Sequence, residues 1–495
     1  MKVVVSGWVW LPIDELEEHQ LSNLRRELIV FPRKTTDIEQ AKDPEPILLY
    51  REDHDRRMIG IPRGFYQRFQ TLFHEETFDV SMGAPMRQLD TIWEPTGPFK
   101  EQAIMVEALL KALSPPWGGA LLQAQCGTGK TCCAIEVARR LARRTLVLVH
   151  QEFLLDQWKE RIEEFVPDAR VGVIRQRKCE YKEVGKEREK PDFVVGLLQS
   201  LARDDGGKYP AEMYSRFGLI VGDEGHRVAA PTWGDVIPRF NAAYRLLLTA
   251  TPRRKDRAER VFFEHVSKPT YVAKTVAQVP KIRYLHTGAV LRPIRRGSYR
   301  VDIPSLNSAQ VINQVSRDSM RTRYIADDVV QAVKRGRKIM VVSERLEHLR
   351  DLSREISGIL FGLDLPFVPR LDFYTGEWFV EGEKKKKRTR EELKKAESAN
   401  VLLCTKQMVA EAFDVQALDV IVLATPMSDV EQAIGRVRRW CLPSPEKCRR
   451  LCPWRAGTCQ GKPTPVVVDV VDGQISVLAA KARRRVQFYK TLGSV

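Results

Sequence analysis

The stretch Leu121–Cys132, which reads LLQAQCGTGKTC, decides the fold. An apolar run, Gly119–Ala124, leads into a glycine-rich turn, and a helical run, Cys132–Arg143, follows it. Apolar runs of this length between turn signals are typical of buried strands. The stretch therefore predicts a strand, a tight loop and a helix in direct succession.

The loop has the chemistry of a phosphate cradle. Gly127 and Gly129 can turn tightly and leave backbone N–H groups facing phosphate oxygens, and the helix N-terminus adds its positive dipole end. Lys130 can reach the β- and γ-phosphates, while the hydroxyl of Thr131 can coordinate Mg²⁺. The pattern GxxxxGK[ST] has glycine where this chain has Ala124, which is a departure from it.

Composition narrows the class of protein. The chain has 495 residues, of which 43% are hydrophobic, so it can build several hydrophobic cores. Charged residues make up 29% of the chain, which is typical of a soluble protein. No stretch approaches the about 20 apolar residues of a membrane span, and we expect no membrane partner and no signal peptide. Nine cysteines in so long a chain favour the cell interior over a disulfide scaffold. The net charge of +17 points to nucleic acid, and the alternative is a generally basic enzyme.

Residues 1–94 predict a small α+β domain. Helical spacing covers Asp14–Leu28, and Ile47–Tyr50 and Arg57–Ile61 read as short strands. A tract of mixed basic and aromatic side chains follows, formed by Arg63, Phe65, Tyr66, Arg68 and Phe69. Such a tract can bind nucleic acid, but we favour the interpretation that its aromatic rings are core.

Residues 95–277 alternate short apolar strands with helices, which predicts a parallel sheet covered by helices. The expected strands are Gly119–Ala124, Thr145–His150, Asp192–Leu197, Gly218–Gly222 and Arg245–Ala250. The expected helices include Gln102–Leu113, Glu152–Phe165 and Thr232–Phe240. Arg175–Pro191 is a charged insertion that we expect to form a solvated hairpin or loop.

Residues 278–495 repeat this rhythm without a second phosphate loop. The expected strands are Lys281–Leu285, Lys338–Ser343, Asn400–Cys404, Asp419–Ala424 and Pro465–Val470, with a long amphipathic helix over Ser316–Arg335. The sequence thus predicts an α/β protein with two tandem parallel-sheet lobes and a small N-terminal α+β domain.

A pair of carboxylates, Asp223 and Glu224, directly follows the strand Gly218–Gly222. In a phosphate-loop ATPase the second acidic element lies at the end of a neighbouring strand. The first carboxylate can hold Mg²⁺ through water, and the second can polarise the attacking water. The alternative is that Asp223 and Glu224 form an acidic surface turn. The phosphate loop elsewhere in the chain favours the ATPase interpretation over this alternative.

These motifs make the chain resemble a superfamily 2 helicase with two RecA-like lobes. The matching segments follow in the order of the family: Gln102, Ala124–Thr131 (AQCGTGKT), Leu146–Trp158, Gln199–Ser200, Asp223–His226 (DEGH), Thr249–Pro252 (TATP), Thr405 with Glu411 and Asp414, and Gln432–Arg439. The family accepts alanine at position 124. Gly225 and Ala412 depart from its usual pattern.

The resemblance implies roles for individual residues. ATP would be bound by Gln102, Gly127, Thr128, Gly129, Lys130 and Thr131, with Gln102 at the adenine, and Mg²⁺ by Thr131 and Asp223. Catalysis would involve Lys130, Asp223, Glu224, Arg436 and Arg439, the last two from the second lobe. The nucleic-acid strand would be contacted by Gln199, Ser200, Ser343 and Thr405.

Within superfamily 2, HRVAAPTWGDVI and RLLLTATPRRKD resemble the XPB-like branch, which includes phage branch-migration and poxvirus transcript-release helicases. This resemblance implies an ATP-dependent DNA helicase or translocase acting on double-stranded or branched DNA, a monomer inside a cell or a virus-infected host cell. Two alternatives stay open: an RNA helicase or transcript-release motor, and a catalytically inactive nucleic-acid-binding protein.

The last feature is a cysteine cluster within an apparent insertion, residues 441–462. Cys441, Cys448, Cys452 and Cys459 have the spacing C-x6-C-x3-C-x6-C. Four thiolates can bind Zn²⁺ tetrahedrally, and a polar loop without a core gains order from such a metal. We expect one structural Zn²⁺. The alternative is four reduced thiols in a surface loop.

Overall fold

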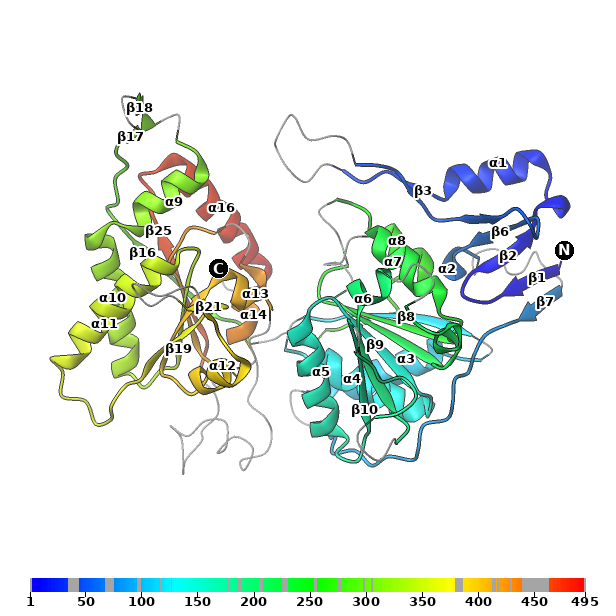
Figure 1. Cartoon of the computed structure of the whole chain (residues 1–495). Helices are drawn as coiled ribbons and strands as arrows, with labels where there is room; N and C mark the ends of the chain where they lie inside the picture. The colour runs from blue at the N-terminus through cyan, green and yellow to red at the C-terminus, as the bar shows by residue number, and fades with distance from the viewer. Residues whose placement is uncertain are drawn as a thin grey trace. The chain divides into compact units, whose positions relative to one another are not determined.

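The structure is a computed structural model. The residues that it describes are 2–33, 44–66, 75–95, 99–115, 117–125, 127–176, 178–184, 189–203, 208–224, 230–252, 256–274, 278–296, 299–303, 306–378, 386–411, 415, 418–427, 430–438 and 463–493. They form two compact units, Met1–Thr275 and Val276–Val495, each of which is described by itself (Figure 1).

Unit 1 begins with a small sheet of strand order β5-β6-β2-β1-β7. Its strands are β1 (Lys2–Val5), β2 (Val9–Pro12), β5 (Arg51–Asp53), β6 (Met58–Ile61) and β7 (Glu75–Phe78). The short pair β3 (Ile29–Val30) and β4 (Ile47–Leu48), the turn η1 (Ile13–Glu15) and the helices α1 (Glu18–Glu27) and α2 (Arg63–Tyr66) complete this part. Alternate residues of β1 and β2 face inward, which gives the sheet its core.

The basic and aromatic tract belongs to this core. Phe65 and Tyr66 have no exposed surface, and Arg63 is 2% exposed. The Arg63 guanidinium donates to backbone carbonyls, from Nε to Ser6 at 2.6 Å and from Nη1 to Ala242 at 2.8 Å. The interpretation of these aromatic rings as core is confirmed. Arg68 and Phe69 lie outside the described residues.

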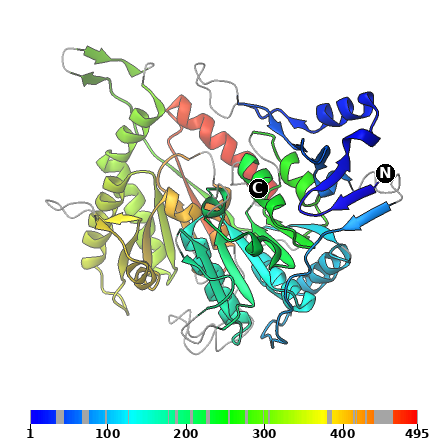
Figure 2. The same cartoon turned by 45° about the vertical axis from the view of Figure 1, so that its right-hand side comes forward.

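The N-terminal sheet is joined tightly to the rest of unit 1. Arg245, which is 1% exposed, donates from Nη2 to the carbonyl of Gly7 at 2.7 Å and from Nη1 to that of His265 at 3.0 Å. Burial lowers the pKa of Arg245 to about 9. A Cβ at Gly7 would come within 1.8 Å of the carbonyl oxygen of Pro238, so only glycine allows this approach. In Figures 1 and 2 this sheet (blue) accordingly lies beside α7 and α8 (green).

The large sheet of unit 1 has the order β11-β10-β12-β9-β13-β14-β8-β15. Its strands are β8 (Gly118–Gln123), β9 (Thr145–Val149), β10 (Val171–Arg175), β11 (Lys178–Cys179), β12 (Phe193–Leu197), β13 (Leu219–Asp223), β14 (Tyr244–Thr249) and β15 (Tyr271–Val272). All neighbours pair in parallel except β10 and β11, an antiparallel pair of which β11 lies in the charged insertion and β10 lies almost wholly before it. The strand β10 was not predicted.

Helices cover both faces of this sheet. One core contains residues from α3 (Glu101–Ala112), α4 (Lys130–Leu141) and α5 (Glu152–Phe165) together with one set of strand side chains. The other core contains residues from α6 (Leu198–Ala202), η4 (Ala211–Ser215), α7 (Ala230–Val236), η6 (Ile237–Arg239) and α8 (Arg260–His265). Because side chains alternate along a strand, Leu121 and Leu122 enter different cores.

Unit 2 is built on a parallel sheet of order β16-β25-β24-β19-β23-β20. Its strands are β16 (Lys281–His286), β19 (Ile339–Ser343), β20 (Leu371–Tyr374), β23 (Val401–Thr405), β24 (Val420–Leu423) and β25 (Val466–Val471). The hairpins β17 (Ile294–Arg296) with β18 (Tyr299–Val301) and β21 (Glu377–Trp378) with β22 (Lys386–Lys387) are separate. Two RecA-like parallel-sheet lobes in tandem are thus confirmed.

The helices of unit 2 are α9 (Ser308–Ser316), α10 (Ser319–Lys334), α11 (Leu346–Phe361), α12 (Arg390–Ala396), α13 (Lys406–Glu411), α14 (Glu431–Val437) and α16 (Ser476–Thr491). The predicted single helix Ser316–Arg335 is wrong at its beginning. Ser316 is the last residue of α9, and α10 begins only at Ser319. Asp318 caps α10 by accepting a hydrogen bond from the backbone N–H of Arg321 at 2.9 Å. In the part of the chain that the structure describes, no helix is both long and apolar enough to span a membrane.

Candidate active site

The phosphate loop follows β8 and has the left-handed turns that the sequence predicts. Gly127 has φ of 87° and Gly129 has φ of 92°, which side chains with a Cβ rarely adopt. The backbone N–H of Cys133 donates to the carbonyl of Gly129 at 3.0 Å and begins α4. Thr131 is half-buried in the first turn of this helix. The loop N–H groups and the helix N-terminus together form an anion site.

Lys130 lies under the loop and not in open solvent. It is 8% exposed, and its Nζ donates to the carbonyl of Ala124 at 2.9 Å. The same Nζ is 3.5 Å from Oε1 of Glu224. A lysine held between a carbonyl and a carboxylate, at the foot of a phosphate loop, can turn to a phosphate oxygen when an anion binds.

The two carboxylates extend from the end of β13, next to β14 in the sheet. Asp223 is the last residue of the strand, and the chain takes a left-handed turn at Glu224, whose φ is 49°. The backbone N–H of Glu224 donates to the carbonyl of Leu248 at 3.0 Å and holds this turn. Non-glycine residues in this region are strained, and such strain is common where a side chain must be aimed. Here the turn brings Glu224 to Lys130.

Asp223 has a partner that sequence reasoning did not identify. The indole N–H of Trp158, on α5, donates to Oδ2 of Asp223 at 2.8 Å, and both side chains are buried. Burial, followed by the charge of Glu224, raises the pKa of Asp223 to about 6. A buried carboxylate with so little compensation fits a cation ligand, because a bound divalent ion would favour its charged form. Thr131 and Asp223 are the residues that would hold Mg²⁺.

The raised pKa of Asp223 predicts a pH dependence of cation binding. Because its folded pKa lies above the ordinary value of 3.8, ionising Asp223 costs folding stability as pH rises from about 4 to about 6. Only the ionised form binds a cation, so the affinity of the nucleotide-free protein for Mn²⁺ should fall about tenfold between pH 7 and pH 5. The Mn²⁺ affinity at each pH can be measured by titrating the protein with Mn²⁺ and following free Mn²⁺ by electron paramagnetic resonance.

Asp168→Asn, at an exposed position, should keep this pH profile, whereas Asp223→Asn should lose binding at every pH. Equal Mn²⁺ affinity at pH 5 and pH 7 would remove Asp223 from the cation site.

The threonines of the TATP stretch lie beside the loop. Thr249 ends β14 and is fully buried, and its backbone carbonyl accepts from the N–H of Ala124 at 3.0 Å. Its Oγ1 accepts from the N–H of Thr251 at 3.2 Å. The end of β14 is therefore hydrogen-bonded, through the Thr249 carbonyl, to Ala124 at the start of the phosphate loop.

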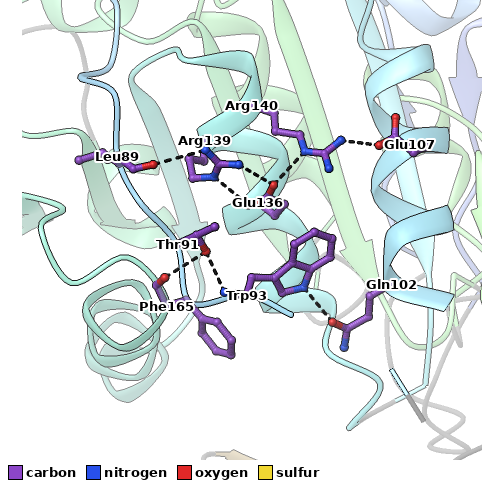
Figure 3. Close-up of polar contacts among 9 residues, drawn as sticks. All are labelled: Leu89, Thr91, Trp93, Gln102, Glu107, Glu136, Arg139, Arg140 and Phe165. Carbon is purple, nitrogen blue, oxygen red and sulfur yellow. Dashed lines mark hydrogen bonds and ion pairs between the residues drawn. The ribbon is translucent and has the colours of Figure 1, made fainter. Parts of the chain in front are cut away.

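Gln102 is placed against the phosphate loop by α3. It is 5% exposed, and its Nε2 donates to the carbonyl of Thr128 at 2.9 Å. Its Oε1 accepts from the indole N–H of Trp93 at 2.9 Å (Figure 3). Both polar groups of the amide, which we expected at the adenine, thus have partners inside unit 1.

The residues expected to contact nucleic acid lie at strand ends in both units. Gln199 and Ser200 follow β12; Gln199 donates to the carbonyl of His150, and Ser200 accepts from the N–H of Gln176 at 3.1 Å. Ser343 ends β19 without exposed surface, and its hydroxyl is 3.1 Å from Nδ1 of His348. Thr405 ends β23 and is half-buried. The partners of Ser200 and Ser343 in this structure are thus internal.

Some of the predicted residues lie outside the described part of the chain. Arg436 is half-buried on α14, whereas Arg439, Asp414, Gly225 and His226 lie outside the described residues. Cys441, Cys448, Cys452 and Cys459 lie outside them as well. Within the ranges that are described, no group of His, Cys, Asp or Glu side chains could hold a metal ion through three or more members.

Comparison with known proteins matches the part of the chain that carries these residues. The sequence family described as "Type III restriction enzyme, res subunit" matches residues 96–254, which include the phosphate loop and both carboxylates. A protein of Acanthamoeba polyphaga mimivirus, named "Putative ATP-dependent RNA helicase", is 26% identical over 432 residues, 86% of this chain and 76% of its own.

Two further proteins are similar to this chain. A "Transcript termination protein" of Cowpox virus is 25% identical over 331 residues, 64% of this chain and 62% of its own. The crystal structure of T4 UvsW aligns over 99% of this chain and 97% of its own, with 16% identity and a TM-score of 0.39. The phosphate loop, the paired carboxylates and the two parallel sheets resemble those of superfamily 2 helicases, and the similarity to the mimivirus and cowpox proteins supports this family for the chain.

Proposed function

We propose that this protein is an ATP-dependent DNA translocase or helicase that moves along, or remodels, double-stranded or branched DNA. The observation that carries the proposal is the meeting of Lys130 and Glu224 at 3.5 Å, with Asp223 beside them, at the foot of an anion-binding loop. That arrangement suits phosphoryl transfer, and the second parallel sheet supplies the other half of a motor. The net charge of +17 supports a polyanionic track.

The chain's own residues divide the work of hydrolysis. Lys130 and the loop N–H groups bind the phosphates, and Glu224 orients the attacking water and accepts its proton. Thr131 and Asp223 would hold Mg²⁺, which would supply positive charge beside the phosphates. By resemblance to the family, Arg436 and Arg439 complete this chemistry from the second lobe. Gln199, Ser200, Ser343 and Thr405 contact the phosphate backbone of the strand.

A second candidate is an RNA helicase or a transcript-release motor. The names of two relatives favour it, since the mimivirus protein is named for RNA and the cowpox protein for transcript termination. The chemistry at Lys130 and Glu224 is the same for both tracks, so the track itself must be varied to distinguish them.

The test is ATPase activity of the full chain with equal nucleotide concentrations of duplex DNA, forked DNA, single-stranded DNA and RNA. We expect duplex or forked DNA to stimulate most. Stimulation by RNA alone would replace the proposal with the second candidate. Absence of hydrolysis with every polymer would indicate a catalytically inactive binding protein.

Binding to DNA should weaken steeply with salt and show little dependence on sequence. Each neutralised phosphate releases counterions, so six or more contacts would lower affinity by about 10³-fold between 50 and 200 mM salt. The proposed contacts reach the backbone and not base edges, so duplexes of different sequence should bind alike. Fluorescence anisotropy measures both. An affinity that changes less than threefold across this range would contradict the proposed backbone contacts.

We also propose one structural Zn²⁺ on Cys441, Cys448, Cys452 and Cys459, by their number and spacing alone. Purified protein should then contain about one Zn²⁺ per chain by elemental analysis, with four sulfur ligands at about 2.3 Å by X-ray absorption. Cys448→Ser should lower the metal content, whereas Cys179→Ser, outside the cluster, should not. A metal-free protein with full ATPase activity would reduce the cluster to four free thiols.

A further inference from the structure

The side chain of Asp223 accepts a hydrogen bond from a neutral donor on another element. The indole N–H of Trp158 lies 2.8 Å from Oδ2 of Asp223, and the two residues are only 2% and 8% exposed. A carboxylate that loses a partner in so buried a place is not repaid by water, which makes the loss costly. The bond therefore constrains the direction in which the Asp223 carboxylate points.

The helix α5 fixes the position of the donor. Its buried residues lie on one face of the helix and are Leu154, Leu155, Trp158 and Ile162. They enter the same core as residues of β9 and β13, two strands that pair in the sheet. The indole thus reaches the carboxyl end of β13 from a helix that covers the sheet, and the packing of the whole helix holds it there.

A neutral donor suits a residue that has to bind a cation. An indole N–H only donates and carries no charge, so it orients the carboxylate without neutralising it. A lysine or arginine in its place would compete with a divalent ion for the charge of Asp223. The adjacent acid is held differently, since Nζ of Lys130 lies 3.5 Å from Oε1 of Glu224. The acid that would hold Mg²⁺ and the acid that would orient water therefore have partners of different kinds.

The bond from Trp158 leaves Asp223 able to act as a ligand. Each carboxylate oxygen can accept about two hydrogen bonds, so acceptor positions remain on both oxygens for a cation or its water. Carboxylates that bind metals are commonly oriented by partners of this kind, and losing such a partner lowers metal affinity about 10- to 100-fold. We expect the lower end of this range, because Asp223 is expected to hold the ion through water.

We propose that Trp158 is a positioning residue for the cation site, and that its indole N–H holds the Asp223 carboxylate in the orientation that binds Mg²⁺. The inference rests on the proposed ATP site. Trp158 acts through Asp223 and not on the phosphates. Removing its N–H should therefore weaken cation binding and leave the binding of nucleotide without metal as it is.

The experiment uses the full chain carrying Trp158→Phe, which keeps an aromatic ring and removes the donor. The Kd of Mn²⁺ for the nucleotide-free protein, measured by electron paramagnetic resonance, should rise about tenfold. The Kd of a fluorescent ATP analogue in the presence of EDTA should change less than about twofold, because the phosphate loop is intact. In steady-state hydrolysis, the Mg²⁺ concentration that gives the half-maximal rate should rise about tenfold, while kcat at saturating Mg²⁺ changes less than about threefold.

Trp233→Phe is the matched control. Trp233, on α7, is also 2% exposed and packs in the core on the other face of the sheet. It lies beside the same strand end, since a Cβ on Gly222 would come within 2.4 Å of its ring. Among the described residues, its indole N–H has no hydrogen-bond partner. Trp233→Phe thus makes the same change of side chain near Asp223 without removing a bond, and it should leave the Mn²⁺ affinity unchanged.

A second replacement at position 158 separates the hydrogen bond from packing. Benzothienylalanine has sulfur in place of the indole N–H and nearly the same shape, so it removes the donor with little change in volume. It should weaken Mn²⁺ binding by the same factor as Trp158→Phe.

Three results would overturn the inference while leaving the ATP site in place. They are an unchanged Mn²⁺ affinity in either variant of Trp158, an equal loss of Mn²⁺ affinity in Trp233→Phe, and an equal loss of ATP-analogue binding in EDTA. If the unmutated protein binds neither Mn²⁺ nor the ATP analogue, the proposed ATP site itself falls, and the inference falls with it.

Discussion

Lys130→Ala is expected to lower ATP hydrolysis at least about 10³-fold, because it removes the charge that balances the β- and γ-phosphates in the transition state. Lys130 is also the cation facing Glu224 at 3.5 Å, and its charge lowers the pKa of the buried Asp223. Without it, the charges of the buried Asp223 and the half-buried Glu224 are less compensated, so the affinity for ATP should fall as well. Steady-state hydrolysis and binding of a fluorescent ATP analogue measure the two effects.

The control for this variant is Lys111→Ala, an exposed lysine on the neighbouring helix α3. It removes the same charge from unit 1 without touching the loop, and both hydrolysis and binding should stay as in the unmutated protein. More than a tenth of the original hydrolysis rate in Lys130→Ala would show that the loop is not the phosphate site.

Glu224→Gln should separate binding from chemistry. The amide keeps the size of the side chain and the left-handed turn, which the bond from the Glu224 N–H to the carbonyl of Leu248 holds. It cannot accept a proton from water, so kcat should fall about 10³-fold. The Kd of ATP should change less than threefold, because the groups that bind the phosphates remain. Single-turnover kinetics with radiolabelled ATP measures the chemical step directly.

Glu163→Gln, on the exposed face of α5, is the matched control and should hydrolyse ATP at the original rate. If Glu224→Gln does so too, the general base lies elsewhere. Because it should bind ATP without cleaving it, Glu224→Gln is also expected to remain on DNA longer than the unmutated protein.

The parallel sheets could be predicted because their strands are short, apolar and bounded by turn residues. β8, for example, covers Gly118–Gln123 against a predicted Gly119–Ala124. β10 was missed because Gly172 interrupts its apolar run VGVIR. The structure gives the reason for this glycine, since a Cβ there would lie 2.1 Å from the carbonyl oxygen of Glu180 in the hairpin partner.

The site was predictable where chemistry follows directly from a strand end. The proximity of Lys130 to Asp223 and Glu224 could be predicted because parallel strands bring their carboxyl ends to one edge of a sheet. Trp158 and Trp93 were missed because their role is one indole N–H each, donated to a buried acceptor. Trp158 and Asp223 are 65 positions apart, and no local pattern connects them. The only hint in the sequence was that Trp158 is the last residue of the segment Leu146–Trp158, which resembles a helicase motif.

The buried guanidinium groups of Arg63 and Arg245 have a consequence for any attempt to isolate the motor. Among the described residues, the hydrogen bonds of both guanidinium groups go to backbone carbonyls, and those of Ser6 and Gly7 come from the N-terminal sheet. A shortened protein that starts at Pro95 would lose Arg63 altogether, would remove the Gly7 carbonyl from Arg245, and would bare the apolar side chains of Ala258 and Val261, which pack in the core of the N-terminal sheet. Such a fragment should aggregate. A minimal ATPase of this kind therefore has to keep its first residues.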